Sequence, residues 1–230
     1  TEKLLAPEDC RELVALYAAD PLHIDVVHPG VNHDVFVPGS RAEAARRLGV
    51  GVDQRVELFA GRLQPHKGPD VVIEALPSLI ESGIQFAVVA EGDRGYPAAL
   101  EDLAARYPGR VAARVNYEEG VAHRLMAGAD MLAHPARFEP CGLVPIYGLR
   151  YGTVPIVRRC GGMADSVTDA TPEALARGTA NGFSFDEPST GAFLGCVARA
   201  LEMYRQPIAW RKIQACGMVE DFSWRRSAGA

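Results

Sequence analysis

Nearly continuous apolar runs alternate along the chain with segments whose apolar positions recur every three or four residues. Apolar runs of this kind predict strands that are buried on both faces of a parallel sheet. The expected strands are residues 24–30, 56–61, 85–92, 110–115, 130–135 and 153–158. The helical spacing, with Gly or Pro near the ends, covers residues 69–82, 96–107 and 118–129.

This strand–helix alternation predicts an α/β protein, with a Rossmann-like, doubly wound, mainly parallel sheet and helices on both faces. Beyond residue 188 the pattern is helical, over residues 190–204 and 207–218. We therefore expect a Rossmann-like domain over residues 1–188 and a helical C-terminal extension over residues 189–230, packed on the same domain. Ligands of open α/β sheets bind beyond the carboxyl ends of the strands, so the loops there are the first to examine.

Length and composition narrow the function. The chain has 230 residues, 48% of them hydrophobic and 23% charged, which suits a globular protein with a sizeable core. A net charge of −5 argues against nucleic-acid binding through a bulk positive field, but it permits a local basic patch. No apolar run is long enough for a membrane span. The five scattered cysteines form no CxxC pair, which favours a reducing cytoplasm over a disulfide framework or a zinc site.

Two of the predicted strands end in loops with candidate ligand-binding residues. The loop after residues 56–61 places Arg62 and Lys67 five residues apart. Arg offers a planar fork and Lys a point charge, so together they suit a diphosphate. A solvated turn with two surface cations is the alternative. In residues 90–95, Gly92 would allow a ligand to approach the backbone, although a simple Asp-containing turn explains that loop equally well.

The stretch "ARFEPCGLVPIYGLRYG", residues 136–152, predicts a helix that starts after Gly142. Amides from about Cys141 to Val144 should then be unpaired at the positive end of that helix, where a phosphate or a sugar hydroxyl binds readily. Glu139 lies just upstream. It is either an acid that faces a ligand or a charge that stabilises the helix start by roughly 0.3–1 kcal/mol.

A fourth loop, residues 158–167, carries Gly161 and Gly162 at the start of another expected helix. Its amides could face an anion, although a double Gly is also common in turns. The four loops follow predicted strands at their carboxyl ends. Together they predict a site for a diphosphate that carries hydroxyl-rich groups.

The motif "RFEPCGL…YGLRYGTVPIVRRCGGMADSV", residues 137–167, resembles bacterial glycogen synthases and plant starch synthases, which are retaining glucosyltransferases of the GT-B fold. The likeness covers about residues 56–229 and includes "GRLQPHKG" and "WRKIQACGMVEDFSW". Residues 1–55 look more like the GT-B transferases related to the inositol-phosphate glycosyltransferase of mycothiol synthesis. Either a divergent natural protein or a chimera would combine the two. The start at Thr1 rather than Met suggests a piece of a longer chain.

The resemblance implies roles for individual residues in donor binding. Arg62 and Lys67 would hold the donor diphosphate, and Glu139 would face the transferred sugar as a positioning and electrostatic residue. These three are the expected catalytic residues. The amides around Cys141, Gly142 and Leu143 would help to place the sugar, Gly161 and Gly162 would lie near the donor, and Tyr117 could stack on the base. In a variant of this motif, other family members carry a second Glu eight positions after the first. Here that position is Tyr147, and glycogen synthases also have Tyr there.

The resemblance also implies the ligands and partners. The donor would be ADP-glucose or UDP-glucose as a substrate, with no metal and no other cofactor. The N-terminal acceptor domain of a GT-B enzyme would be missing, so we expect little turnover from this chain. Its exposed cleft face would favour a homo-oligomer. A donor domain for a small acceptor such as an inositol phosphate and an inactive Rossmann half-domain remain as alternatives.

Overall fold

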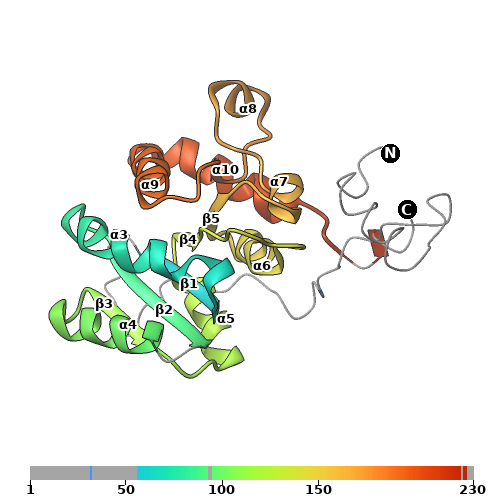
Figure 1. The fold of residues 1–230 in the computed structure, drawn as a ribbon. Helices are drawn as coiled ribbons and strands as arrows, with labels where there is room; N and C mark the ends of the chain where they lie inside the picture. The colour runs from blue at the N-terminus through green and yellow to red at the C-terminus, as the bar shows by residue number, and fades with distance from the viewer. Residues whose placement is uncertain (1–31, 33–55, 93–94, 224, 227–230) are drawn as a thin grey trace.

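A computed structural model of the chain describes residue 32 and residues 56–92, 95–223 and 225–226. Within these residues, six strands form one sheet in the order β3-β2-β1-β4-β5-β6, and all neighbours run parallel (Figure 1). The strands are β1 (Val56–Leu63), β2 (Gln85–Gly92), β3 (Val111–Arg114), β4 (Met131–His134), β5 (Val154–Arg158) and β6 (Phe183–Phe185). This order is that of a doubly wound sheet, so the predicted fold class is confirmed.

The helices of the described residues connect these strands or follow the last of them, and they cover the sheet. They are the 3-10 helix η2 (Pro65–Lys67) and the α-helices α3 (Pro69–Glu81), α4 (Gly95–Arg106), α5 (Glu119–Gly128), α6 (Leu143–Tyr151), α7 (Gly162–Ser166), α8 (Pro172–Arg177), α9 (Thr190–Tyr204) and α10 (Pro207–Val219). None of the helices in this part of the chain is long and apolar enough to cross a membrane.

Both faces of the sheet are buried, as the continuous apolar runs predicted. Along β1, Phe59 and Leu63 face the larger core beneath α3, α4 and α9, whereas Leu58 and Ala60 face a smaller core beneath α5 and α6 (Figure 1). Successive residues of a strand point to opposite faces, so a strand covered on both sides has no polar face to alternate with.

The sheet opens between β1 and β4, where the chain order reverses. β1 pairs with β2 along its whole length, from Val56–Gln85 to Leu63–Gly92. It pairs with β4 only at Glu57–Met131 and Leu58–Leu132. The two strands therefore part toward their carboxyl ends, and the loops that follow them border a crevice. Doubly wound sheets bind their ligands at this kind of switch point.

Most predicted elements lie where the sequence pattern indicated. The helix expected over 190–204 is α9 itself, and Ser189 caps it by accepting the Ala192 amide at 3.2 Å. The strand β6 and the helix α8 were not predicted, because three and six residues are too short to show a period. The strand expected over residues 24–30 lies outside the described residues. So does the segment from residue 1 to residue 31 as a whole.

Candidate functional site

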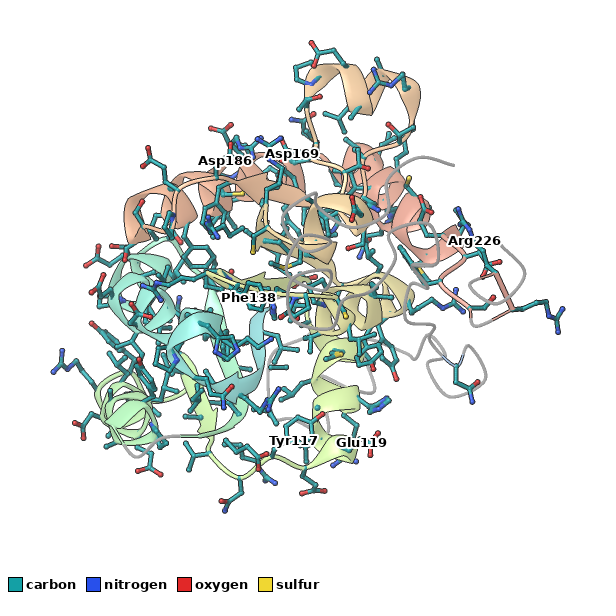
Figure 2. The ribbon with its side chains drawn as sticks, turned by 45° about the vertical axis from the view of Figure 1, so that its right-hand side comes forward. Tyr117, Glu119, Phe138, Asp169, Asp186 and Arg226 are labelled. Atoms are coloured by element: carbon teal, nitrogen blue, oxygen red, sulfur yellow. The ribbon has the colours of Figure 1, made fainter. Side chains whose placement is uncertain are left out.

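A cavity of about 460 Å³ lies at the carboxyl edge of β1 and β4, where the two strands part. Its walls come from β1, η2, β2, β4, α5, α6 and the loops before α5 and α6. Most residues predicted for the site line it: Arg62, Lys67, Tyr117, Glu139, Cys141, Leu143 and Tyr147. Figure 2 shows Tyr117 beside the start of α5 and Phe138 nearer the middle of the molecule. The other wall residues include His66, Glu91, Met126 and His134.

Glu139 is held in the cavity by three hydrogen bonds. Only 8% of it is exposed. Its Oε2 accepts a hydrogen bond from the Lys67 ammonium and a second from His134 Nε2 at 2.8 Å. Its Oε1 accepts the Gly142 amide at 3.3 Å. Burial by itself would raise the pKa of Glu139, but the bonds from His134 and Lys67 outweigh it and lower that pKa to about 2. Glu139 is thus an ionised, buried carboxylate near neutral pH.

The turn that carries Lys67 is pressed against the loop that carries Glu139. Gly68 ends η2 in the left-handed conformation, with φ 72°. A Cβ atom at this position would lie 2.4 Å from the Pro135 carbonyl oxygen, so the approach requires glycine. The Arg137 amide donates to the His66 carbonyl at 2.7 Å and joins the two loops further. Lys67 and Glu139, 72 residues apart in sequence, are brought together by these backbone contacts.

A second connection between the same loops is made by Arg137. Its guanidinium binds both carboxylate oxygens of Asp70, at 2.8 and 2.6 Å, and donates to the Pro65 carbonyl at 2.9 Å. The hydrogen bond from Arg137 lowers the pKa of Asp70. Because Asp70 lies in the first turn of α3, this pair ties the segment before α6 to the segment after β1. Arg137 was not among the predicted site residues.

The two predicted phosphate-binding cations differ in their surroundings. Arg62 is exposed at the carboxyl end of β1, and its guanidinium has no acceptor in the described part of the chain. Lys67 is largely buried, with 15% of its side chain exposed, and it is paired with Glu139. Arg62 can therefore receive an anion as it stands, whereas Lys67 has to share its charge with Glu139 or leave it to do so.

The start of α6 contributes backbone polar groups to the cavity, where Leu143 and Val144 line it. Gly142 precedes the helix with φ 70°, and its carbonyl accepts the Ile146 amide at 3.2 Å. The amides of Leu143 and Val144 in the first turn have no acceptor within the helix, which leaves them to a ligand. The predicted run of unpaired amides is wrong at Gly142, because that amide donates to Glu139.

Tyr117 and Tyr147 contribute two neighbouring aromatic side chains to the cavity wall. Tyr117 is 45% exposed and precedes α5, while Tyr147 lies in α6. Burial raises the pKa of Tyr147, and the nearby Tyr117 and Glu119 raise it further. Both phenols are therefore neutral near neutral pH. A flat, uncharged wall of this kind suits the ring of a base.

Gly161 and Gly162 do not line the cavity. They lie behind the Glu139–Cys141 segment, where the Gly162 amide donates to the carbonyls of Glu139 at 3.3 Å and Pro140 at 3.1 Å. A Cβ atom on Gly161 would approach the Glu139 carbonyl oxygen to 2.0 Å. The amide of Gly162 is thus not bare, as the sequence had suggested, and the pair supports the loop that bears Glu139.

His134 is one of the cavity residues that the sequence did not predict, and it contacts the predicted residue Glu139. It ends β4, it is 3% exposed, and it binds the carboxylate predicted to face the sugar. The apolar pattern of residues 130–135 predicts only a buried strand. A polar side chain in the last position of such a strand lies at the carboxyl edge of the sheet, where ligands bind. This position is the feature from which His134 could have been predicted as a site residue.

Comparison with known proteins agrees with this architecture. The family model for glycosyl transferases group 1 matches residues 40–214. The catalytic domain of starch synthase IV from Arabidopsis thaliana, bound to ADP and acarbose, is similar with a TM-score of 0.86 and 24% identity, over 97% of this chain and 51% of that one. HepE from Anabaena, in complex with UDP-glucose, has a TM-score of 0.74 and 18% identity, over 98% and 60%.

A third similar structure concerns a single domain. The C-terminal domain of a group 1 glycosyl transferase, LpcC from Francisella tularensis, has a TM-score of 0.65 and 18% identity, over 82% of this chain and 95% of that domain. The chain thus spans about half the length of the larger relatives, and it covers most of one isolated C-terminal domain. The likeness of residues 1–55 to the mycothiol enzymes stays a prediction. The chain belongs to the family of group 1 glycosyl transferases.

Proposed function

We propose that this chain is the donor-binding half of a retaining glucosyltransferase similar to glycogen and starch synthases, with ADP-glucose or UDP-glucose as the donor. The observation that carries this proposal is the convergence of Arg62, Lys67 and Glu139 on one cavity at the switch point of the sheet. The ligands of two similar structures, ADP in one and UDP-glucose in the other, support it.

The proposed chemistry follows from the charges of the cavity. Transfer from a nucleoside diphosphate sugar builds negative charge on the leaving diphosphate and positive charge on the anomeric carbon. Arg62, Lys67 and the positive end of α6 would stabilise the leaving group, which is often the largest contribution to catalysis. The donor diphosphate is the substrate, and these side chains and amides would bind it without a metal or another cofactor.

Glu139 has a positioning and electrostatic role in this proposal. Its carboxylate is ionised and held through both oxygens, so it can accept a hydrogen bond from a sugar hydroxyl and stabilise positive charge nearby. We do not assign it as a covalent nucleophile. Departure and attack would occur on the same face of the sugar, with the leaving phosphate accepting the proton of the acceptor.

The base would lie against the aromatic wall. Tyr117 is exposed enough to stack on a ring, and Tyr147 stands behind it without a charge. Gly161 and Gly162 would act on the donor only indirectly, through the Glu139–Cys141 loop that they support. The amides of Leu143 and Val144 would face the sugar or its phosphate.

Turnover would require a second lobe. Closure of two lobes excludes water and completes the active site of such enzymes. We therefore expect this chain to bind nucleoside diphosphates weakly and to transfer little or no glucose by itself. Robust transfer to glycogen by the purified chain would contradict that expectation. The open cleft face would also favour self-association, which analytical ultracentrifugation over a range of concentrations tests.

Two alternatives remain within reach of experiment. A small acceptor such as an inositol phosphate would leave the donor site unchanged, because the acceptor binds mostly to the other lobe. An inactive Rossmann half-domain would bind no nucleotide at all. The first alternative is separated from a glucan acceptor by transfer assays with the two-lobed protein, and the second by binding alone.

Calorimetric titration with ADP, UDP and GDP tests the proposal. We expect one or two of these nucleotides to bind, and the Arg62→Ala and Lys67→Ala variants to bind about tenfold more weakly or worse, because each loses a charged hydrogen bond to phosphate. Arg211→Ala is the matched control, because Arg211 is exposed on α10 and away from the cavity. Absence of binding to all three nucleotides would leave the inactive half-domain.

A further inference from the structure

Lys67 serves two negatively charged groups in the function proposed above. In the structure its ammonium binds Glu139 Oε2. In the proposed complex it binds the donor diphosphate. One ammonium cannot neutralise both fully, so binding of the diphosphate must weaken the pair between Lys67 and Glu139. The affinity for a nucleotide then includes the cost of leaving Glu139 without its cation.

That cost depends on what else holds Glu139. A carboxylate with 8% exposure that loses its cation is strongly destabilised unless other donors remain, because little water can reach it to replace the partner. The Gly142 amide is one remaining donor, but at 3.3 Å it makes a long bond to Oε1. His134 Nε2, at 2.8 Å from Oε2, is the shorter bond and binds the oxygen that Lys67 would leave.

The surroundings of His134 determine which of its nitrogens carries the proton. Nδ1 is buried and has no hydrogen-bond partner among the described residues. An N–H group there would be a buried unsatisfied donor, whereas a lone pair costs less. A proton on Nε2 instead points at the ionised Glu139. The arrangement therefore favours the tautomer in which His134 is a permanent donor to Glu139.

We propose that His134 is a positioning residue for Glu139, which holds the carboxylate in place when Lys67 turns to the diphosphate of a nucleotide ligand. His134 itself does not touch the ligand. It lowers the cost of releasing Lys67, and it keeps Glu139 where a sugar hydroxyl can reach it. The proposal deepens the function given above, on which it rests, by naming the residue that couples phosphate binding to placement of the acid.

A double-mutant cycle with ADP as the probe tests this coupling by calorimetry. Glu139→Gln should tighten ADP binding about threefold to tenfold, because Lys67 loses its competing partner. His134→Phe keeps a ring but no donor, so it should weaken binding by a similar factor. In the Glu139→Gln background, His134→Phe should change the affinity less than twofold, because there is no carboxylate left to hold.

A conservative pair of variants separates donation from packing. The amide of His134→Gln can reach Glu139 and should restore affinity to within about twofold of the wild type. The amide of His134→Asn is too short and should behave like His134→Phe. Equal losses with and without Glu139, or no rescue by Gln, would show that His134 only fills space. If His134→Phe does not fold, the comparison of His134→Gln with His134→Asn tests the same point.

A measurement without nucleotide keeps the two proposals distinguishable. The Lys67→Ala variant imitates departure of the lysine. In this variant, the chemical shift of the Glu139 carboxyl carbon is measured by NMR as a function of pH. We expect the pKa of Glu139 to stay below its ordinary value in Lys67→Ala and to rise above it in Lys67→Ala with His134→Phe. If this result is found but ADP does not bind the wild type, the proposed function fails and the role of His134 stands. If ADP binds but neither measurement depends on His134, only the role of His134 is overturned.

Discussion

Glu57 lies in the central strand β1 and is completely buried, with no hydrogen-bond partner for either carboxylate oxygen among the described residues. Burial raises its pKa from 4.5 to about 8, so it is mostly protonated in the folded protein at neutral pH. In the unfolded chain it ionises above about pH 4.5. The apolar run predicted a strand buried on both faces, but it could not show that Glu57 would lack a hydrogen-bond partner there.

The free energy of unfolding should therefore fall as the pH rises from about 5 to about 8. The contribution of Glu57 is fully present below its unfolded pKa and is lost as the pH passes toward its raised folded pKa. Over this range we expect a loss of up to about 3 kcal/mol from this group. Urea unfolding at pH 5 and pH 8 measures it, and Glu57→Gln should remove most of the difference.

The control is Glu101→Gln, because Glu101 is exposed on α4. The free energy of unfolding of the Glu101→Gln variant should depend on pH as that of the wild type does. A Glu57→Gln variant with an unaltered pH dependence would mean that Glu57 is hydrated or paired in solution.

At the scale of elements, helices α3 and α9 lie within one residue of the predicted ranges, since long amphipathic segments carry a clear period. The site loops were predicted in part. Arg62, Lys67 and Glu139 meet because parallel strands bring their carboxyl ends to one edge. The Arg137–Asp70 pair was not foreseeable, because no spacing rule joins positions 67 residues apart.

Arg137→Ala should weaken ADP binding about threefold to tenfold, although Arg137 does not line the cavity. Without the bidentate bond to Asp70, the segment with Lys67 and the segment with Glu139 lose one of their connections. The stability should change by about 1 kcal/mol or less, since the pair is partly exposed. Calorimetry with ADP and thermal unfolding give the two values.

Arg159→Ala supplies the matched comparison. Arg159 pairs with Asp186 in another exposed ion pair. Figure 2 shows Asp186 near Asp169, away from Tyr117 and Phe138. This variant should lose similar stability and bind ADP as the wild type does. Equal binding by both variants would mean that the Arg137–Asp70 pair does not position the site.

At the scale of the whole molecule, the C-terminal helices and the sheet share one core. Phe193 of α9 and Trp210 of α10 belong to the same buried cluster as Phe59 of β1, and Trp210 stacks on Phe183 of β6 with ring centroids 6.2 Å apart. The helical pattern predicted the helices but could not show which sheet residues they cover. Contacts of this kind depend on tertiary packing.

We expect the described part of the chain to unfold in one cooperative transition. In a Trp224→Phe background Trp210 is the only indole, so its fluorescence reports on α10, while far-UV circular dichroism reports on all helices. The two urea transitions should coincide, because α9 and α10 bury their apolar faces in the common core. A separate early transition of Trp210 would show that the helical extension unfolds by itself.

The parting of β1 and β4 after Leu58–Leu132 has a consequence for how such a site can change. The opening is a property of hydrogen-bonded backbone, whereas the residues proposed to bind a ligand lie beyond the point where the pairing stops, at the end of β1 and in the segments that follow β1 and β4. Side chains there can be exchanged without closing the crevice or disturbing the two cores. The sheet and its two cores therefore have to be conserved for the crevice to exist, whereas the side chains that line the crevice can change to bind a new ligand.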